Sequence, residues 1–371
     1  MAITAAMVKE LREVTGSGMM DCKKALTATE GDMDKAVEWL REKGLATAQK
    51  KASRIAAEGL AKVLVSEDGK KAVAVEVNAE TDFVAKNEKF QNYVAQVAEQ
   101  AMETGAADID AFLAEPWKFD TSVTVKEALA GMVAVIGENM NIRRFTQLQE
   151  DNGFVACYTH MGGKIGVLLD VVTDVVNDEI KDMAKNIAMQ VAAMKPEYTS
   201  EAEISDEYIA KEKEIIISSS LNSPDTLPKP ILNKLIETAI NEKVWSDEDI
   251  AMFEEKKSNF QFVFNFLSKE AKPQLAQLAV ADRANIEGNK IFMGAVDGRI
   301  KKQMKEVCLL SQPYVRAEDS KTTVGQYVAQ VAKANGANIT IKGFVRFETG
   351  EGIEKKQEDF AAEVAAQMAG K

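Results

Sequence analysis

Residues 59–77 read GLAKVLVSEDGKKAVAVEV, and residues 153–171 read GFVACYTHMGGKIGVLLDV. The two stretches align without a gap at an offset of 94 residues, and the same offset matches Gln-Val-Ala at 96–98 with Gln-Val-Ala at 190–192. Further matches at this offset are Gly69 with Gly163, Lys70 with Lys164, Val73 with Val167 and Asn92 with Asn186. The chain therefore contains two copies of one structural unit.

Each copy has the pattern of a β-hairpin followed by a helix. In copy one, Asp68-Gly69 is a tight-turn signal between the apolar stretches 60–65 and 72–77. In copy two, apolar residues recur at helical spacing over residues 180–194, and Pro196 follows as a stop. The pattern predicts two small antiparallel sheets, each accompanied by a helix.

A third strand is available to each copy. Residues 141–148 could serve the first sheet, and residues 338–347 could serve the second. Because the latter stretch lies far along the chain, copy two must be interrupted by an insertion, which we place at residues 203–302. Its apolar segments predict a mostly helical insertion, and the placement of its charged residues and prolines indicates that it is solvated.

The two ends of the chain predict further helices. Helical periodicity begins at Ile3 and indicates a compact three-helix module, in which Asp32 is expected to begin the third helix and Gly44 to end it. Residues 358–368 predict a short amphipathic helix that carries Phe360 on its apolar stripe.

These patterns together predict an α+β protein. We expect six segments: a three-helix module with its linker (1–54), a first core subdomain (55–148), the first part of a second core subdomain (149–202), a helical insertion arm (203–302), the second part of that subdomain (303–349) and a C-terminal helical module (350–371).

Composition and charge exclude several classes of protein. The formal net charge of -12 disfavours direct contact with nucleic acid, because acidic surfaces repel phosphate backbones. Cys22, Cys157 and Cys308 are odd in number and far apart, which supports neither a disulfide framework nor a zinc site. The sequence has no apolar run long enough to span a bilayer and no signal-peptide pattern at its start. We therefore expect a cytoplasmic protein that is not in a membrane.

Catalytic and cofactor motifs are missing from the sequence. The single histidine, His160, lies at a predicted hairpin turn, so a histidine triad or a two-histidine metal site has no second member. Gly163-Lys164 resembles the end of a phosphate-binding loop, but Tyr158 and Ile165 replace the glycine and the hydroxyl residue that such a loop needs. We expect no cofactor, no bound nucleotide and no covalent chemistry.

The segment Thr81-Asp82-Phe83-Val84-Ala85-Lys86-Asn87 differs from the rest of the repeat. The offset places residues 175–178 opposite residues 81–84, and none of these four pairs is identical. A charged and aromatic loop on a rigid sheet is a common way to display binding residues. The alternative interpretation is that Phe83 fills the local core and that Thr81 or Asp82 begins the following helix.

Six blocks of sequence resemble the signatures of one known family, elongation factor Ts. They are residues 8–12, 15–26, 76–87, 136–144, 345–355 and 359–364. The resemblance covers residues 1 to about 215 and about 289 to 371. It implies an N-terminal module like a ubiquitin-associated domain, a core of two subdomains, a projecting coiled-coil arm and a C-terminal helical module.

The resemblance also implies a function and a partner. Members of this family exchange the guanine nucleotide of elongation factor Tu during translation. Asp82 and Phe83, flanked by Thr81 and Val84, match the family residues that enter a cleft near the magnesium and phosphate site of Tu.

Other contacts with Tu are implied by the same resemblance. The N-terminal module, with Met19 and Met20, and the C-terminal helix, with Phe360, would lie against the GTPase domain of Tu. The turn at His160 would lie near the third domain of Tu. For the two methionines the alternative is ordinary packing inside the module, and for His160 it is an exposed turn without a contact.

Residues 216–288 depart from the compact form of the family, which puts the shape and the role of the arm in doubt. Two other functions stay open. The three-helix module could serve an adaptor that recognises ubiquitin-like folds without exchanging nucleotides, and an enzyme would need a metal or cofactor. The sequence does not determine whether the insertion is an elongated arm, a compact bundle or a dimerisation element.

Overall fold

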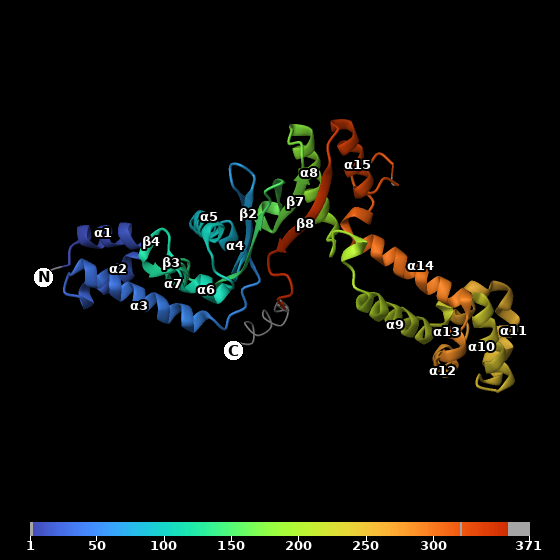
Figure 1. Cartoon of the computed structure of the whole chain (residues 1–371). Helices are drawn as coiled ribbons and strands as arrows, with labels where there is room; N and C mark the ends of the chain where they lie inside the picture. The colour runs from blue at the N-terminus through green and yellow to red at the C-terminus, as the bar shows by residue number, and fades with distance from the viewer. Residues whose placement is uncertain (1–2, 320, 355–371) are drawn as a thin grey trace, which may run out of the picture. The chain divides into compact units, whose positions relative to one another are not determined.

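The computed structural model describes residues 3–319 and 321–354 of the 371 residues (Figure 1). They divide into two compact units. The core unit comprises residues 3–195, 314–316 and 326–354, and the insertion unit comprises residues 196–313, 317–319 and 321–325. The helix predicted at residues 358–368 lies outside the described residues.

The core unit begins with the predicted three-helix module. Its helices are α1 (Ala5–Thr15), α2 (Met19–Ala28) and α3 (Met33–Lys51). The Asp32 side chain accepts a hydrogen bond from the backbone N–H of Lys35, which confirms the predicted start of α3. Leu11 and Leu26 are fully buried between the helices and form the centre of a small apolar core.

The prediction that Gly44 ends the third helix is wrong. α3 continues to Lys51, and Gly44 is buried in its interior. A Cβ atom at this position would lie 3.6 Å from the carbonyl oxygen of Ala130 in α7 (Val125–Ile136). That distance is an ordinary van der Waals contact, so Gly44 lies inside a continuous α3 where this helix meets α7, and it does not cap the helix.

The repeat forms two three-stranded antiparallel sheets with the strand orders β1-β2-β5 and β6-β7-β8. The strands are β1 (Glu58–Val65), β2 (Lys71–Ala79), β5 (Met140–Gln149), β6 (Gly153–His160), β7 (Ile165–Thr173) and β8 (Ile339–Glu348). β2 and β7 occupy the same residues at the offset of 94, and both predicted third strands are confirmed. Even the irregularity in register recurs, after Glu76 in β2 and after Asp170 in β7.

The first glycine of each copy has the same physical role. A Cβ atom on Gly59 would lie 2.1 Å from the carbonyl oxygen of Val77, and one on Gly153 would lie 1.9 Å from that of Val171. Both distances are far shorter than any real contact, so only glycine lets the first strand of each sheet cross so close to its neighbour.

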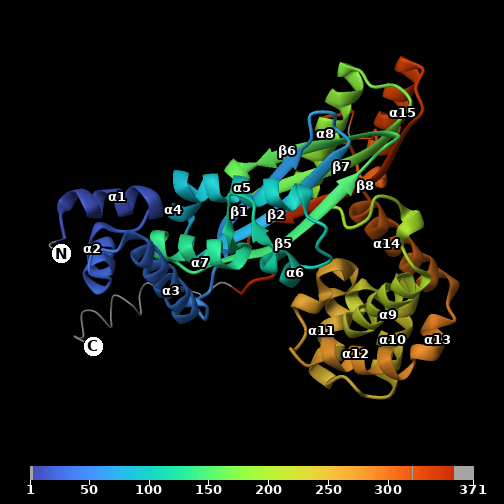
Figure 2. The same cartoon turned by 60° about the vertical axis from the view of Figure 1, so that its left-hand side comes forward.

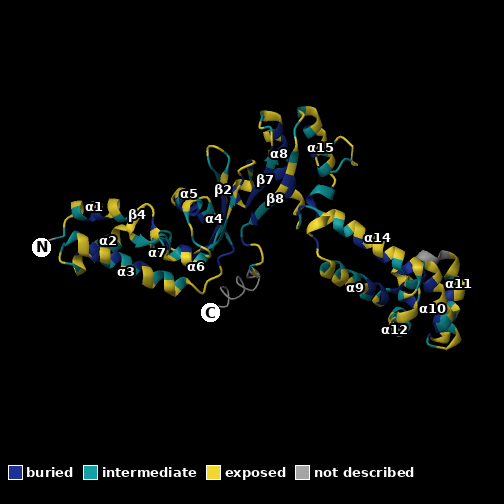
Figure 3. Ribbon diagram, viewed as in Figure 1, coloured by how far each residue is buried: buried dark blue, intermediate teal, exposed yellow. Residues whose placement is uncertain are grey.

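Helices cover one face of each sheet. α5 (Glu88–Glu103) packs on β1 and β2, and α8 (Asp178–Met194) packs on β6 and β7 (Figure 2). The other faces of the two sheets meet, with small residues such as Ala72 and Ala74 of β2 against Leu168 of β7. β7 is consequently buried along almost its whole length (Figure 3).

Further elements of the core unit were not predicted individually from the sequence. They are α4 (Asp82–Ala85), α6 (Ile109–Ala114), β3 (Pro116–Trp117), β4 (Asp120–Thr124), α7 and α15 (Val324–Asn335). β3 and β4 form a two-stranded sheet, and α7 packs against α3. α15 is joined to α8 by a hydrogen bond of 3.4 Å from the Asn186 amide to the Tyr327 hydroxyl.

The insertion unit is mostly helical, as its sequence pattern predicts. Its helices are α9 (Asp206–Asn222), α10 (Lys229–Asn241), α11 (Asp247–Lys256), α12 (Ala271–Ala281), α13 (Arg283–Glu287) and α14 (Lys290–Val307). They enclose an apolar core of their own, in which the indole N–H of the buried Trp245 donates to the carbonyl of Ala271 at 2.9 Å. Whether this unit acts as an arm stays a prediction.

Candidate functional site

The loop that departs from the repeat connects β2 to α5 through the single helical turn α4. Val84 of this turn is buried in the core of the first sheet, whereas the Phe83 side chain is 79% exposed. The interpretation of Phe83 as a core residue is therefore wrong. Covering a large apolar ring that is exposed to water lowers the free energy, so Phe83 is a candidate contact residue.

Asp82 lies beside the ring at the start of α4. Its carboxylate accepts a hydrogen bond of 2.8 Å from the Lys86 ammonium, four residues on. This bond, aided by the positive charges of Lys86 and Lys164, lowers the pKa of Asp82 below its usual value. The Lys86 nitrogen also lies 5.9 Å from the centre of the Phe83 ring, so the loop presents a charged pair next to an exposed aromatic.

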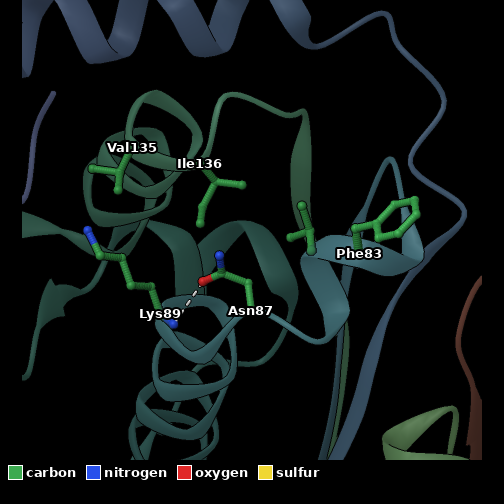
Figure 4. Close-up of a pocket in the computed structure, with 6 residues that line it drawn as sticks. Phe83, Asn87, Lys89, Val135 and Ile136 are labelled. Carbon is green, nitrogen blue, oxygen red and sulfur yellow. Dashed lines mark hydrogen bonds between the residues drawn. The ribbon is translucent and has the colours of Figure 1, made fainter.

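A shallow pocket of about 330 Å³ lies between this loop and the end of α7. It is lined by Phe83, Val84, Asn87, Lys89, Val135 and Ile136 (Figure 4). Although Phe83 is one of the lining residues, its ring points away from Val135 and Ile136 on the opposite side of the pocket. The sequence of the loop alone does not indicate that residues of α7 line this pocket. One of them, Ile136, belongs to the family-like block at residues 136–144.

His160 is the last residue of β6 and leads into the short turn Met161–Gly163. Its Nδ1 atom lies 3.0 Å from the Tyr158 hydroxyl, so the ring is held on the surface rather than buried. Met161 adopts a positive φ of 50° and is 65% exposed, which leaves its side chain available to a partner.

The turn and α4 both pack against β1. Gly163 is close enough to Leu60 that an added Cβ would lie 2.7 Å from a Leu60 methyl. Lys164 contributes to the low pKa of Asp82, as described above. The fold therefore brings the Asp82 loop of copy one and the His160 turn of copy two to one region of the core unit.

Met19 and Met20 begin α2 in the N-terminal module. Both side chains are exposed, which contradicts the alternative of ordinary packing inside the module. They line a surface pocket of about 600 Å³ together with apolar and basic residues of α1 and α2. Its remaining lining residues are Ile3, Thr4, Ala5, Val8, Lys9, Arg12 and Lys23. Phe360, the other predicted contact, lies outside the described residues.

Within residues 3–319 and 321–354, His, Cys, Asp and Glu side chains form no group of three that could hold a metal ion. Across the same residues, no helix combines the length and the apolar character needed to cross a membrane. The arrangement that the described residues do present is one of exposed apolar side chains beside charged ones, which is suited to binding another protein.

Comparison with known proteins relates this arrangement to one family. A sequence model described as Elongation factor TS matches residues 80–351. Elongation factor Ts of Clostridium tetani is 44% identical over 366 residues, which cover 99% of this chain and 99% of that protein. Elongation factor Ts of Clostridium novyi is 43% identical over the same shares, and that of Clostridium perfringens strain SM101 is 42% identical over the full length of both chains. The extent of these matches shows that the chain belongs to the elongation factor Ts family.

Proposed function

We propose that this chain exchanges the guanine nucleotide of elongation factor Tu by inserting the Asp82–Phe83 loop near the magnesium and phosphate site of Tu. Membership of the elongation factor Ts family makes the chain a nucleotide exchange factor of translation elongation, with Tu as its partner. The observation that carries the loop assignment is the 79% exposure of Phe83 on a turn whose neighbour Val84 is buried.

The proposed step is mechanical and electrostatic. An aromatic wedge near the magnesium site displaces the elements of Tu that hold the ion. Loss of the ion removes the main counter-charge of the GDP phosphates and weakens GDP binding. GDP and the exchange factor thus lower the affinity of Tu for each other by one shared factor, and abundant GTP then fills the emptied site. No covalent bond is made or broken.

The remaining contacts extend the same proposal. Met19 and Met20, together with Phe360, would bind the GTPase domain of Tu, and the turn at His160 would bind its third domain. The exposure of both methionines and of Met161 beside His160 supports this assignment. Methionine side chains are flexible and polarizable, so they adapt to a partner surface.

The organisation of the chain is proposed on the same grounds. It comprises a ubiquitin-associated-like module at residues 1–54, core subdomains at residues 55–148 and 149–202 with 303–349, an arm at residues 203–302 and a C-terminal module at residues 350–371. We place its action in the cytoplasm, where translation takes place.

Stopped-flow release of fluorescent GDP from Tu of the same species tests the proposal. We expect this protein, at amounts well below that of Tu, to accelerate release and to turn over many times. Tight binding to Tu without faster release would overturn the exchange function and leave an adaptor. The binding itself is measured in parallel by a shift in gel filtration.

A further inference from the structure

The turn that carries Phe83 is held by a carboxylate from a distant part of the chain, Glu138. Glu138 accepts two hydrogen bonds from Thr81, one from its backbone N–H at 3.0 Å and one from its hydroxyl at 2.7 Å. Both Glu138 oxygens are used, one for each bond. Hydrogen bonds to an ionised acceptor are about twice as strong as neutral ones, so this is a firm attachment.

This attachment replaces the usual cap of a helix. Thr81 occupies the position before α4, where a threonine hydroxyl normally accepts a hydrogen bond from the first turn of the helix. Here Thr81 makes no such bond, and its hydroxyl donates to Glu138. Four residues are too few to form a stable helix on their own. The orientation of α4 therefore depends on contacts outside the turn.

A second contact runs in the opposite direction between the same two segments. Glu80 accepts a hydrogen bond of 2.5 Å from the backbone N–H of Asn139. The Asn139 amide in turn donates to the carbonyl of Arg54 at 2.7 Å. Each segment thus supplies a glutamate that binds the backbone of the other.

The segment that carries Glu138 is itself firmly placed. Gly137 ends α7 in a left-handed conformation with a φ of 89°, and its carbonyl accepts a hydrogen bond from Lys51 of α3. Asn139 is only 3% exposed. Glu138 therefore connects the exposed turn to a rigid part of the core unit, where α3, α7 and β5 meet.

The structure assigns to Glu138 the role of a positioning residue for exchange, which holds the Asp82–Phe83 turn in the orientation that enters Tu. This assignment rests on the proposed function of the loop. Without Glu138 the turn samples other orientations, and only the competent fraction of molecules can act at each encounter. Because a small misplacement of a displacing group can lower a rate strongly, loss of Glu138 should slow the step in which GDP is released.

The test is the Glu138→Ala variant in stopped-flow GDP release over a full range of concentrations. We expect the maximal release rate to fall by about tenfold, because the competent fraction of the turn falls. The half-saturating concentration should change by less than about twofold, since the contacts of the N-terminal module and the hairpin turn are unaffected. Glu138→Gln keeps an acceptor and a donor for Thr81 and should recover most of the rate.

Glu127→Ala is the matched control. Glu127 accepts hydrogen bonds from the backbone N–H of Thr124 at 2.8 Å and from its hydroxyl at 3.1 Å, at the opposite end of α7. Its removal breaks a threonine–glutamate pair of the same kind and lowers the stability of the same helix. We expect it to lower the melting temperature at least as much as Glu138→Ala does, with an unchanged release rate.

A double variant separates positioning from a general loss of structure. If Glu138 acts through Phe83, the Glu138→Ala change adds nothing to the rate defect of Phe83→Ala. Normal release by Glu138→Ala, with Phe83→Ala impaired, would overturn the role of Glu138 alone. So would equal losses in the Glu138→Ala and Glu127→Ala variants. Normal release by Phe83→Ala would instead overturn the proposed function of the loop.

Discussion

The two copies of the repeat form sheets of the same topology, but they differ at the point where the chain leaves the sheet. In copy two, α8 begins at Asp178, and the Asn177 side chain accepts a hydrogen bond of 2.9 Å from the backbone N–H of Ile180. In copy one, the residue aligned with Asn177 is Phe83, and α5 begins one turn later, after Asn87. A residue that stabilises a helix in one copy is thus replaced by an exposed aromatic ring in the other.

A second difference lies at the register irregularity that both copies share. Glu76 and Asp170 are aligned there, and both are buried. Glu76 accepts hydrogen bonds from several donors. They are Asn78 at 3.1 Å, Arg143 at 3.0 Å, Arg144 at 2.6 Å and the backbone N–H of Gly350 at 2.8 Å. Asp170 has an ion pair with Lys342 at 3.5 Å, and one of its oxygens lacks a hydrogen-bond partner. The same position is therefore well satisfied in copy one and poorly satisfied in copy two.

The largest effect is expected for Glu76→Ala. The change leaves two arginines and a backbone N–H without their acceptor and should lower the free energy of unfolding by about 3 kcal/mol. Urea denaturation followed by circular dichroism measures this loss. The control is Glu351→Ala, which removes a half-exposed carboxylate that lies 3.5 Å from both Arg144 and Arg346. Because Arg346 keeps its ion pair with Glu348 at 2.7 Å, the change should cost less than about 1 kcal/mol. Similar losses for both variants would contradict the account of Glu76.

Phe83→Ala is expected to change the function rather than the fold. Removal of the exposed ring should slow GDP release from Tu by about 100-fold, because the displacing group is lost. The melting temperature should stay unchanged, since the side chain has no core contacts to lose. Stopped-flow release and a thermal melt on the same sample measure both. Val176→Ala removes an exposed apolar side chain from the aligned loop of copy two and should change neither quantity.

Asn177→Ala should show the opposite behaviour to Phe83→Ala. Loss of the cap on α8 should lower the free energy of unfolding by about 1 kcal/mol. GDP release should remain at the wild-type rate when measured at a temperature where the variant is folded. A defect in release without a loss of stability would mean that the loop of copy two also contacts Tu.

The aligned carboxylates should also give opposite responses to pH. Burial alone would raise the pKa of Glu76, but the hydrogen bonds from Gly350, Asn78 and Arg144 lower it overall. Its stabilising effect is therefore present above the usual glutamate pKa and is lost as the pH falls through the lower value in the folded protein. Burial raises the pKa of Asp170, with Lys342 opposing the shift. The native state consequently loses stability as the pH rises from about 4 through that raised value.

Asp170→Asn provides the smallest of the expected effects. The variant should be more stable than the wild type at neutral pH by about 1 kcal/mol or less, and the gain should shrink toward pH 4. Urea midpoints measured across this range test the sign. A gain that grows as the pH falls would show that Asp170 is stabilised as a carboxylate, as Glu76 is.

The sequence was sufficient to predict the hairpins and strands of the repeat. It was not sufficient for features that depend on contacts between residues far apart in the chain. The hairpins and both third strands followed from alternation, turn signals and the constant offset. Gly44 was misassigned because glycine commonly ends helices, whereas here α3 continues to Lys51 and Gly44 lies where it contacts α7. The identity of the loop was visible as a break in the repeat. The exposure of Phe83 and its support by Glu138 depend on contacts across 57 residues of chain, which local patterns do not contain.

Photo-crosslinking from position 83 would show whether this loop enters the region of the nucleotide site of Tu. A photoreactive phenylalanine analogue is placed at position 83 and, as the matched control, at the exposed position 176. We expect position 83 to crosslink to the GTPase domain of nucleotide-free Tu, excess GDP to suppress this product, and position 176 to give no product. Equal crosslinking from both positions, or a product at position 83 that GDP does not affect, would contradict the proposed role of the loop.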